Sequence, residues 1–457
     1  MSKFVRSSKF RHVYGSPFKR QDCYDNIRVT RNSWDSNYCD VNNKFLAVIT
    51  ESSGGGAFIV LPLEKQGKLK TDTPIVTGHT SAVLDVAWNP FNDNELASCA
   101  EDATIRIWTI PDGGLTENLK EADVVLNGHT RKVGQIVWHP TVRGLLFSVS
   151  NDTTVRAWNS STGEQLKQYE GFGDVVYCLS FNYKGNRFAV VSKDKKLRVF
   201  DVHSEKMLKE VLAHKGSKAS RCVYLSAANE EELVVTTGFS ESSERQCTLW
   251  SEDLEVKESL RIDTSSGLLF PFYDPYLKIL YLAGKGDGNI RYYEVTRNAP
   301  YIHYLSEFKS DKPQRGFGFL PKRACRTEAC EIARFYKLHS TNFVEPIQMV
   351  VPRKSELFQD DLYPECAGDE PSLEIEDFLA GKDAAPKLVS LKEGFSSQKG
   401  VVQASPSLNT NKKNELKDFA DDVEQLKEQL KSARLELKKK DAEIAKLRAE
   451  LGDNKGM

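Results

Sequence analysis

Two copies of one long motif constrain this sequence more than any other feature. The first copy runs from Gly78 to Ile110 and the second from Gly128 to Asn159. Each opens with Gly-His and has a Trp near its end, and matching positions are offset by 50 residues (129 − 79 = 50 for the histidines). Repetition of this length predicts a fold built from several copies of one supersecondary unit, each of which buries its apolar face against its neighbours.

Polar residues at fixed positions in both copies give the spacing a physical reason. We expect each Asp to lie in the tight turn between the second and third strands, where its carboxylate accepts hydrogen bonds from the turn and from the opening His. The His then reaches a strand hydroxyl, which meets the indole N–H. Four polar groups are buried at low cost when every donor is matched. The predicted networks are His79, Ser98, Asp102 and Trp108 in the first copy, and His129, Ser148, Asp152 and Trp158 in the second.

A set of His, Asp and Ser also suggests a catalytic triad. The set recurs once per copy, however, as a structural element does and an active site does not. We therefore interpret each copy as similar to a WD40 repeat, in which four short strands form one blade of a β-propeller.

Five weaker units complete the predicted ring. Asp194 and Asp287 precede an aromatic residue by the same spacing that separates Asp102 from Trp108. The sequence thus predicts an all-β fold with a seven-bladed propeller over residues 1–341, whose basic N-terminal segment closes the last blade with a strand at 8–15. The other blades are expected around residues 45–62, 171–202, 213–253, 263–295 and 301–340.

Composition excludes several classes of function. A net charge of −1 over 457 residues gives no general attraction to nucleic acid or to an anionic membrane. No apolar run is long enough to span a bilayer, and the first ten residues lack the apolar core of a secretory signal. The nine cysteines are scattered without a CxxC pair, so we expect reduced thiols in a cytosolic protein, with no metal site and no cofactor.

The pattern changes after the propeller. Residues 342–394 are acidic but keep aromatic side chains, which predicts an extension packed on the propeller, and the polar residues 395–411 predict a flexible linker. Residues 412–457 predict a coiled-coil oligomerisation segment, with a single helix docked on the propeller as the alternative. Its seam residues are Leu416, Phe419, Val423, Leu426, Leu430, Leu437, Ile444, Leu447 and Leu451.

This order of segments resembles the coronin family, in its short form with one propeller. The stretches that carry the resemblance are SKFRHVYG, SGGGAFIVLPL, FSESSERQ, PFYDP, GKGDGNIRYYE, PYIHYLSEF, CEIARFYKL and VPRKSELFQDDLYP. They cover residues 1–394 closely, and the tail is similar by architecture alone. Matches of this length in several blades are more specific than a general WD40 pattern.

The resemblance implies a protein that binds actin filaments through its propeller and catalyses no reaction. It also implies self-association as a dimer or trimer, action with cofilin and the actin-related-protein nucleation complex that branches filaments, and a place in the cytoplasm at the cortical cytoskeleton, actin-rich projections and phagocytic cups. In the family, the Arg of an Ile-Arg-Val stretch before the first blade is central to filament binding. The corresponding residue of this chain is Arg28, and the flanking candidates are Lys9, Arg11, Lys19, Arg20 and Arg31.

Two points stay open at this stage. Many coronin tails carry an Arg-hydrophobic-x-x-hydrophobic-Glu motif that favours trimers, and neither Arg434 nor Arg448 fits it. The alternative function is a WD40 scaffold or substrate receptor without affinity for actin, because propellers support many functions and the fold alone does not choose among them.

Overall fold

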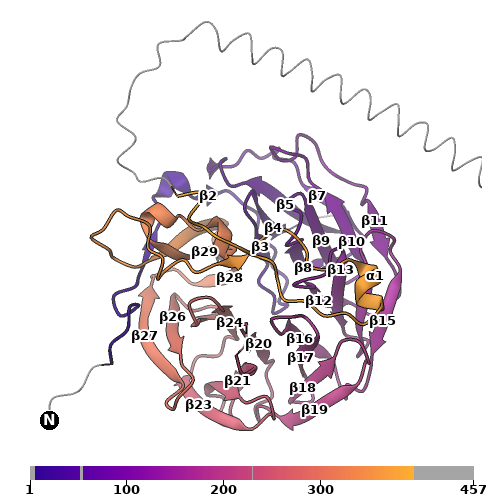
Figure 1. Cartoon of the computed structure of the whole chain (residues 1–457). Helices are drawn as coiled ribbons and strands as arrows, with labels where there is room; N and C mark the ends of the chain where they lie inside the picture. Colours follow the sequence, from indigo (N-terminus) through magenta and orange to yellow (C-terminus); the bar gives the residue numbers. More distant parts are fainter. Residues whose placement is uncertain (1–5, 52–54, 229, 396–457) are drawn as a thin grey trace, which may run out of the picture. The chain divides into compact units, whose positions relative to one another are not determined.

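Strands of this chain hydrogen-bond into seven sheets set around a ring (Figure 1). The computed structural model describes residues 6–51, 55–228 and 230–395. Within these ranges the predicted all-β, seven-bladed WD40 propeller is confirmed. The predicted coiled coil and nearly all of the predicted linker lie outside the described residues.

Blades one to six are antiparallel sheets of four strands each, and in every one the strands follow chain order from the ring axis outward. Blade one contains β3 (Cys39–Val41), β4 (Phe45–Thr50), β5 (Gly56–Pro62) and β7 (Val76–His79). Blade two contains β8 (Val83–Trp88), β9 (Glu95–Ala100), β10 (Ile105–Thr109) and β11 (Val124–Leu126). Blade three contains β12 (Val133–Trp138), β13 (Leu145–Ser150), β14 (Val155–Asn159) and β15 (Gln165–Tyr169).

The next three blades repeat this arrangement. Blade four contains β16 (Val176–Phe181), β17 (Arg187–Ser192), β18 (Lys196–Asp201) and β19 (Met207–Leu212). Blade five contains β20 (Arg221–Leu225), β21 (Leu233–Phe239), β22 (Arg245–Trp250) and β23 (Val256–Asp263). Blade six contains β24 (Leu269–Asp274), β25 (Ile279–Gly284), β26 (Asn289–Val295) and β27 (Ile302–Lys309).

Blade seven joins the two ends of the propeller sequence. Its strands are β28 (Gln314–Phe319), β29 (Glu331–His339) and β30 (Phe343–Val350), and β30 pairs antiparallel with two N-terminal strands, β1 (Tyr14–Pro17) and β2 (Tyr24–Asp25). A short strand, β6 (Gly67–Lys68), pairs parallel with β2. The N-terminal strand therefore begins near the end of the expected 8–15 segment, and the last blade includes a strand beyond residue 341. Three 3₁₀ turns are η1 (Arg20–Asp22), η2 (Lys322–Ala324) and η3 (Thr327–Ala329).

The repeated sequence unit and the blade differ by one strand. The unit that opens at Gly78 begins at the end of β7, the outermost strand of blade one, and continues through the first three strands of blade two. In the same way β27, which the sequence prediction gave to the seventh blade, pairs with β26 in blade six. The apolar runs predicted the strands correctly, and their grouping into blades was shifted.

The burial of each strand follows its position in the ring. Every residue of β4 is buried, because both faces of this strand pack against neighbouring blades. The outermost β23 has no fully buried residue and keeps mixed polar and apolar side chains at its surface. The core therefore consists of apolar layers between adjacent blades, as for sheets that pack face to face.

The ring has two faces. Asp102, Asp152, Asp194 and Asp287 all lie in turns between the second and third strands of a blade, and we call the face that carries these turns the aspartate face. Turns between the first and second strands lie on the opposite face, because successive strands of a blade are antiparallel. We call that side the extension face.

The C-terminal segment crosses the extension face (Figure 1). It contains β31 (Cys366–Ala367), α1 (Ile375–Leu379) and β32 (Leu388–Val389). The Ser372 and Leu373 amides donate to the Thr141 carbonyl at 2.9 and 3.0 Å, and the Ala367 amide donates to the Tyr276 hydroxyl at 2.8 Å. These contacts attach the segment to the turns of blades three and six.

Phe378 anchors α1 to the propeller. Its side chain is 1% exposed, and its ring centroid lies 6.0 Å from that of His139 and 5.1 Å from that of His203. The next residue, Leu379, is 56% exposed on the same short helix. Adjacent residues of equal apolar character therefore have opposite environments.

We expect Phe378→Ala to lower the thermal midpoint, because removing a buried Phe side chain costs about 3–5 kcal/mol. Leu379→Ala is the matched control and should leave the midpoint nearly unchanged. Differential scanning calorimetry of both variants checks this. Equal midpoints for wild type and Phe378→Ala would mean that the extension is not part of the cooperative unit.

Candidate functional site

The first copy of the motif forms a continuous chain of hydrogen bonds. The Trp108 indole N–H donates to Ser98 Oγ at 2.8 Å, and Ser98 Oγ lies 2.8 Å from His79 Nε2. On the other side of the ring, His79 Nδ1 lies 3.0 Å from Asp102 Oδ2. The Thr80 and Thr104 amides also donate to Asp102, at 2.9 and 3.0 Å.

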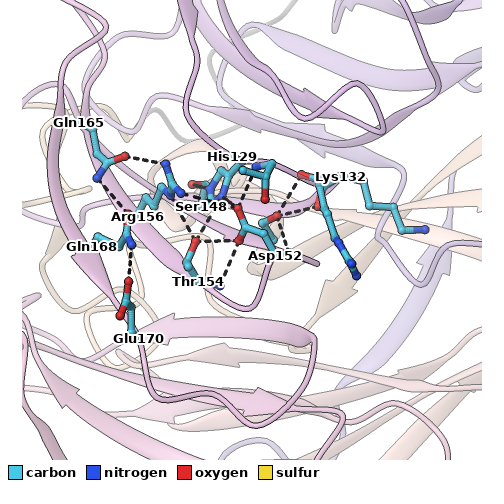
Figure 2. Close-up of polar contacts among 12 residues, drawn as sticks. His129, Lys132, Ser148, Asp152, Thr154, Arg156, Gln165, Gln168 and Glu170 are labelled. Atoms are coloured by element: carbon cyan, nitrogen blue, oxygen red, sulfur yellow. Dashed lines mark hydrogen bonds and ion pairs between the residues drawn. The ribbon is translucent and has the colours of Figure 1, made fainter.

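The second copy has the same geometry. His129 contacts both Ser148 and Asp152 (Figure 2). Its Nε2 lies 2.7 Å from Ser148 Oγ and its Nδ1 lies 2.8 Å from Asp152 Oδ2. Trp158 Nε1 donates to Ser148 Oγ at 2.8 Å. In a neutral His129 with the proton on Nδ1, every donor of this chain has an acceptor. Burial lowers the pKa of His129, which favours that neutral form.

The aspartates of these networks remain ionised. Burial acts to raise the pKa values of Asp102 and Asp152, but the hydrogen bonds that each carboxylate accepts from the His and from the turn outweigh it. The net result is that both pKa values lie well below the usual range of Asp. In both sets the His side chain is 1% exposed and the Asp side chain is 6% or 5% exposed, as in a structural element.

Two other blades use arginine where the first copies use histidine. Asp194 pairs with Arg198 at 2.5 Å, and although burial acts to raise the Asp194 pKa, the hydrogen bonds from Arg198 and Ser192 lower it to about 2. Asp287 pairs with the fully buried Arg245 at 2.6 Å. Both aspartates therefore lie in the expected turn, with a partner that the sequence reasoning did not foresee.

A third histidine network was missed by the sequence analysis. His214 Nε2 lies 2.9 Å from Thr236 Oγ1, which also accepts a hydrogen bond from Trp250 Nε1 at 2.8 Å. Thr236 and Trp250 are 14 residues apart, whereas Ser98 and Trp108 are 10 apart. The longer β21–β22 hairpin accounts for the difference, because its strands and its turn all exceed those of β9 and β10. A search that allowed an insertion in this hairpin would have found the network.

Arg28 occupies a separate surface on the aspartate face. Ile27 and Val29 are buried at 1% and 6% exposure, so the alternation of an extended segment turns Arg28 outward. The Glu51 amide donates to the Arg28 carbonyl at 2.7 Å, and Val29 forms a β-bridge with Thr50. The backbone of Arg28 is thus fixed to the end of β4 while its side chain is exposed.

Further basic residues lie beside Arg28. The pairing of β2 with β6 places Lys68 next to Asp25, and the Asn26 side-chain amide donates to the Leu69 carbonyl at 2.9 Å. Lys70 and Arg28 line one hollow of about 360 Å³. The sequence analysis missed both lysines, and the GKLK run at 67–70 was the feature that could have suggested them. We call Arg28, Arg31, Lys68 and Lys70 the Arg28 surface.

The remaining basic candidates do not all join this surface. Lys9 is exposed and donates to the Asp361 carbonyl of the extension, so it lies apart from the Arg28 surface. Arg11 lies in the same N-terminal turn as Lys9 and is exposed. Lys19 and Arg20 lie at η1 on the outer edge of blade seven, where Arg20 stacks 4.1 Å over the Phe343 ring and pairs with Asp25 at 2.5 Å.

Two structural observations bear on other classes of function. Within residues 6–51, 55–228 and 230–395, His, Cys, Asp and Glu side chains do not gather in groups of three that could hold a metal ion. The same part of the chain contains no helix of the length and apolar character needed to cross a membrane.

Family comparisons match three parts of the sequence. Residues 3–68 match a domain of unknown function (DUF1899). Residues 71–109, 121–159 and 163–201 match the WD domain, G-beta repeat. Residues 344–386 match a type of WD40 repeat.

Individual proteins match over most of the chain. Coronin-2B of Xenopus tropicalis is 52% identical over 404 residues, which cover 88% of this chain and 83% of that protein. Coronin-A of Dictyostelium discoideum is 49% identical over 452 residues, with 98% of this chain and 100% of that protein covered. The crystal structure of the WD40 domain of Toxoplasma gondii coronin aligns with a TM-score of 0.78 at 30% identity, covering 83% of this chain and 97% of that one.

We expect Asp102→Ala and Asp152→Ala each to destabilise the propeller, because each leaves buried donors unpaired at a cost of about 1–3 kcal/mol. Asp112→Ala removes a carboxylate whose side chain is 83% exposed and is the matched control. Thermal melts of the three variants test this expectation. If Asp152→Ala and Asp112→Ala have the same thermal midpoint, the hydrogen-bond chain does not stabilise the propeller.

Proposed function

This chain belongs to the coronin family, and we propose that it binds actin filaments through the aspartate face of its propeller and catalyses no reaction itself. The observation that carries the proposal is the exposed Arg28 on a backbone that two buried neighbours and β4 hold in place. A fixed backbone lowers the entropy lost when the side chain engages a partner. A guanidinium group also binds carboxylates with two parallel hydrogen bonds, which suits an acidic filament.

The Arg28 surface supports this proposal by its charge. Arg28, Arg31, Lys68 and Lys70 are all exposed, and they come from two chain segments joined by the β2–β6 pair. Clustered charges of one sign attract a partner of the opposite sign before contact and help set its orientation. Lys19 and Arg20 are proposed as secondary contacts at the edge of blade seven. Arg11 is proposed as an outlying one.

We further propose self-association through residues 412–457. The heptad seam from Leu416 to Leu451 supports it, and two or more propellers in one assembly would bind a filament at several points. Action with cofilin and the filament-branching nucleation complex follows as a proposal from family membership. Localisation at the cortical cytoskeleton is likewise proposed from family membership.

We expect Arg28→Asp to weaken filament binding severely and Arg28→Lys mildly. Lys keeps the positive charge but cannot form the two parallel hydrogen bonds of a guanidinium group. The loss should be mild, because an exposed ion pair contributes only about 0.2–1 kcal/mol. Arg28→Asp places a carboxylate against an acidic partner, and such like-charge contacts can cost several kcal/mol. Co-sedimentation with filaments across a salt series measures the effect. Wild-type binding should fall as the Debye length shrinks from about 10 Å at 0.1 M to about 3 Å at 1 M.

Lys206→Asp is the matched control, since it puts the same acidic residue on the extension face, in the turn between β18 and β19. It should bind nearly as wild type does, and melting curves should show all variants folded. Filament binding by Arg28→Asp at the wild-type level in low salt would place the contact elsewhere. An equal loss from Lys206→Asp would show a response to net charge alone.

Deleting residues 412–457 should give a monomer that still binds filaments, but more weakly. Linked binding modules gain about 10²–10⁴ in avidity when the geometry allows both to engage. Sedimentation equilibrium of the full chain and the truncated chain, followed by co-sedimentation, tests both parts. A full-length chain that is monomeric at micromolar concentration would contradict the coiled coil and favour the docked helix.

A further inference from the structure

Two cysteines face each other across the boundary of blades four and five. Cys178 lies in β16 and Cys222 in β20, the innermost strands of these blades, and the two residues are 5% and 4% exposed. Cys178 Sγ lies 3.5 Å from the Cys222 carbonyl oxygen, and Cys222 Sγ lies 3.7 Å from the Cys178 carbonyl oxygen. These reciprocal contacts bring each sulfur against the backbone of the other cysteine, although the two residues are far apart in the sequence.

An arginine lies beside this pair. Arg221 Nη1 donates to the Tyr177 carbonyl at 2.9 Å, so its guanidinium group crosses from blade five to the residue before Cys178. Arg221 is 7% exposed, and its Nε has no hydrogen-bond partner among the described residues. The hydrogen bond from the Cys222 thiol, with the Arg221 charge, lowers the pKa of Cys178 despite its burial. Burial raises the pKa of Cys222.

A cavity lies on the aspartate face, near the start of the two strands that carry the cysteines. It measures about 140 Å³, and its wall includes Tyr177 and Arg221, the residues that directly precede the two cysteines, together with Trp34 and Lys132. A water molecule occupies about 30 Å³ in the liquid. A small neutral oxidant such as hydrogen peroxide therefore fits this cavity, which is lined by the residue before each cysteine.

We propose that Cys178 and Cys222 form a peroxide-sensitive pair that closes to a disulfide between blades four and five. The Cys178 thiolate attacks one peroxide oxygen, the O–O bond breaks, and sulfenic acid and hydroxide form. The sulfur of Cys222 then attacks the Cys178 sulfur, the S–O bond breaks, and the leaving hydroxide takes the Cys222 proton as water. In total two thiols and one peroxide give one disulfide and two waters.

Other buried cysteines lack these features. Burial raises the pKa values of Cys247 and Cys325 to about 12, which leaves these thiols protonated and unreactive. The arrangement therefore selects one pair among the nine cysteines. Its product would tie two innermost strands together and restrict the separation of the blades they belong to.

The test is peroxide treatment of the full-length reduced chain, followed by alkylation and non-reducing peptide mass spectrometry. After trypsin, Cys178 lies in the peptide 168–184 and Cys222 in the peptide 222–245, and neither peptide has another cysteine. We expect a cross-linked peptide that a reductant removes, and a rise of several degrees in the thermal midpoint. The exposed Met207 reports the peroxide dose through its sulfoxide.

Variants separate reaction from folding. Cys178→Ala and Cys222→Ala should abolish the thermal shift on oxidation, and Cys247→Ala should keep it. Arg221→Gln should slow cross-linking, because it removes a charge that favours the Cys178 thiolate, and Arg221→Lys should restore part of the rate. The proposal is overturned if both cysteines remain thiols at a dose that oxidises Met207. It is equally overturned if Cys178 is oxidised to sulfinic acid while Cys222 stays free.

Discussion

The hydrogen-bond chain that joins one blade to the next is the interaction on which the ring depends. His79 ends the outermost strand of blade one, yet its ring bonds to Ser98 and Asp102 in blade two. Apolar contact between blades is not directional, so it leaves their relative angle loosely determined. Buried hydrogen bonds require a set geometry, and a mismatch leaves a costly unpaired group. The same bonds that bury polar atoms therefore also position neighbouring blades.

This requirement is met by more than one chemistry. In blade five, Arg245 donates to Asp263 of its own blade and to Asp287 of blade six, both at 2.6 Å. A guanidinium group has five donors in a fixed plane, so one side chain can join two carboxylates across a blade boundary. In blades two, three, four and six the aspartate in the turn is thus the shared element, and its partner varies between His and Arg. A motif defined by histidine alone describes only part of the ring.

The propeller and the first two networks could be predicted from sequence because their residues keep a fixed spacing within one short segment. Features that depend on the meeting of distant segments could not. Lys68 and Lys70 lie beside Arg28 because β2 and β6 pair in parallel, and no local sequence pattern predicts this pairing. Lys9 is close to Arg28 in sequence, but it contacts the extension. The shift of one strand between repeat and blade has the same origin, since a repeated sequence does not say which neighbour a strand will pair with.

The two faces of the propeller differ in whether the C-terminal extension covers them. The extension occupies one face, where Phe378 and the Ser372 and Leu373 amides attach it to blade three. The proposed filament partner needs a broad accessible surface, and the aspartate face is the one that this segment leaves open. On that face Ile27 and Val29 supply apolar contacts to the core, while the residue between them supplies only an exposed charge. A three-residue extended segment thus separates folding from binding, so selection can change the charge of the proposed contact without disturbing the blade beneath it.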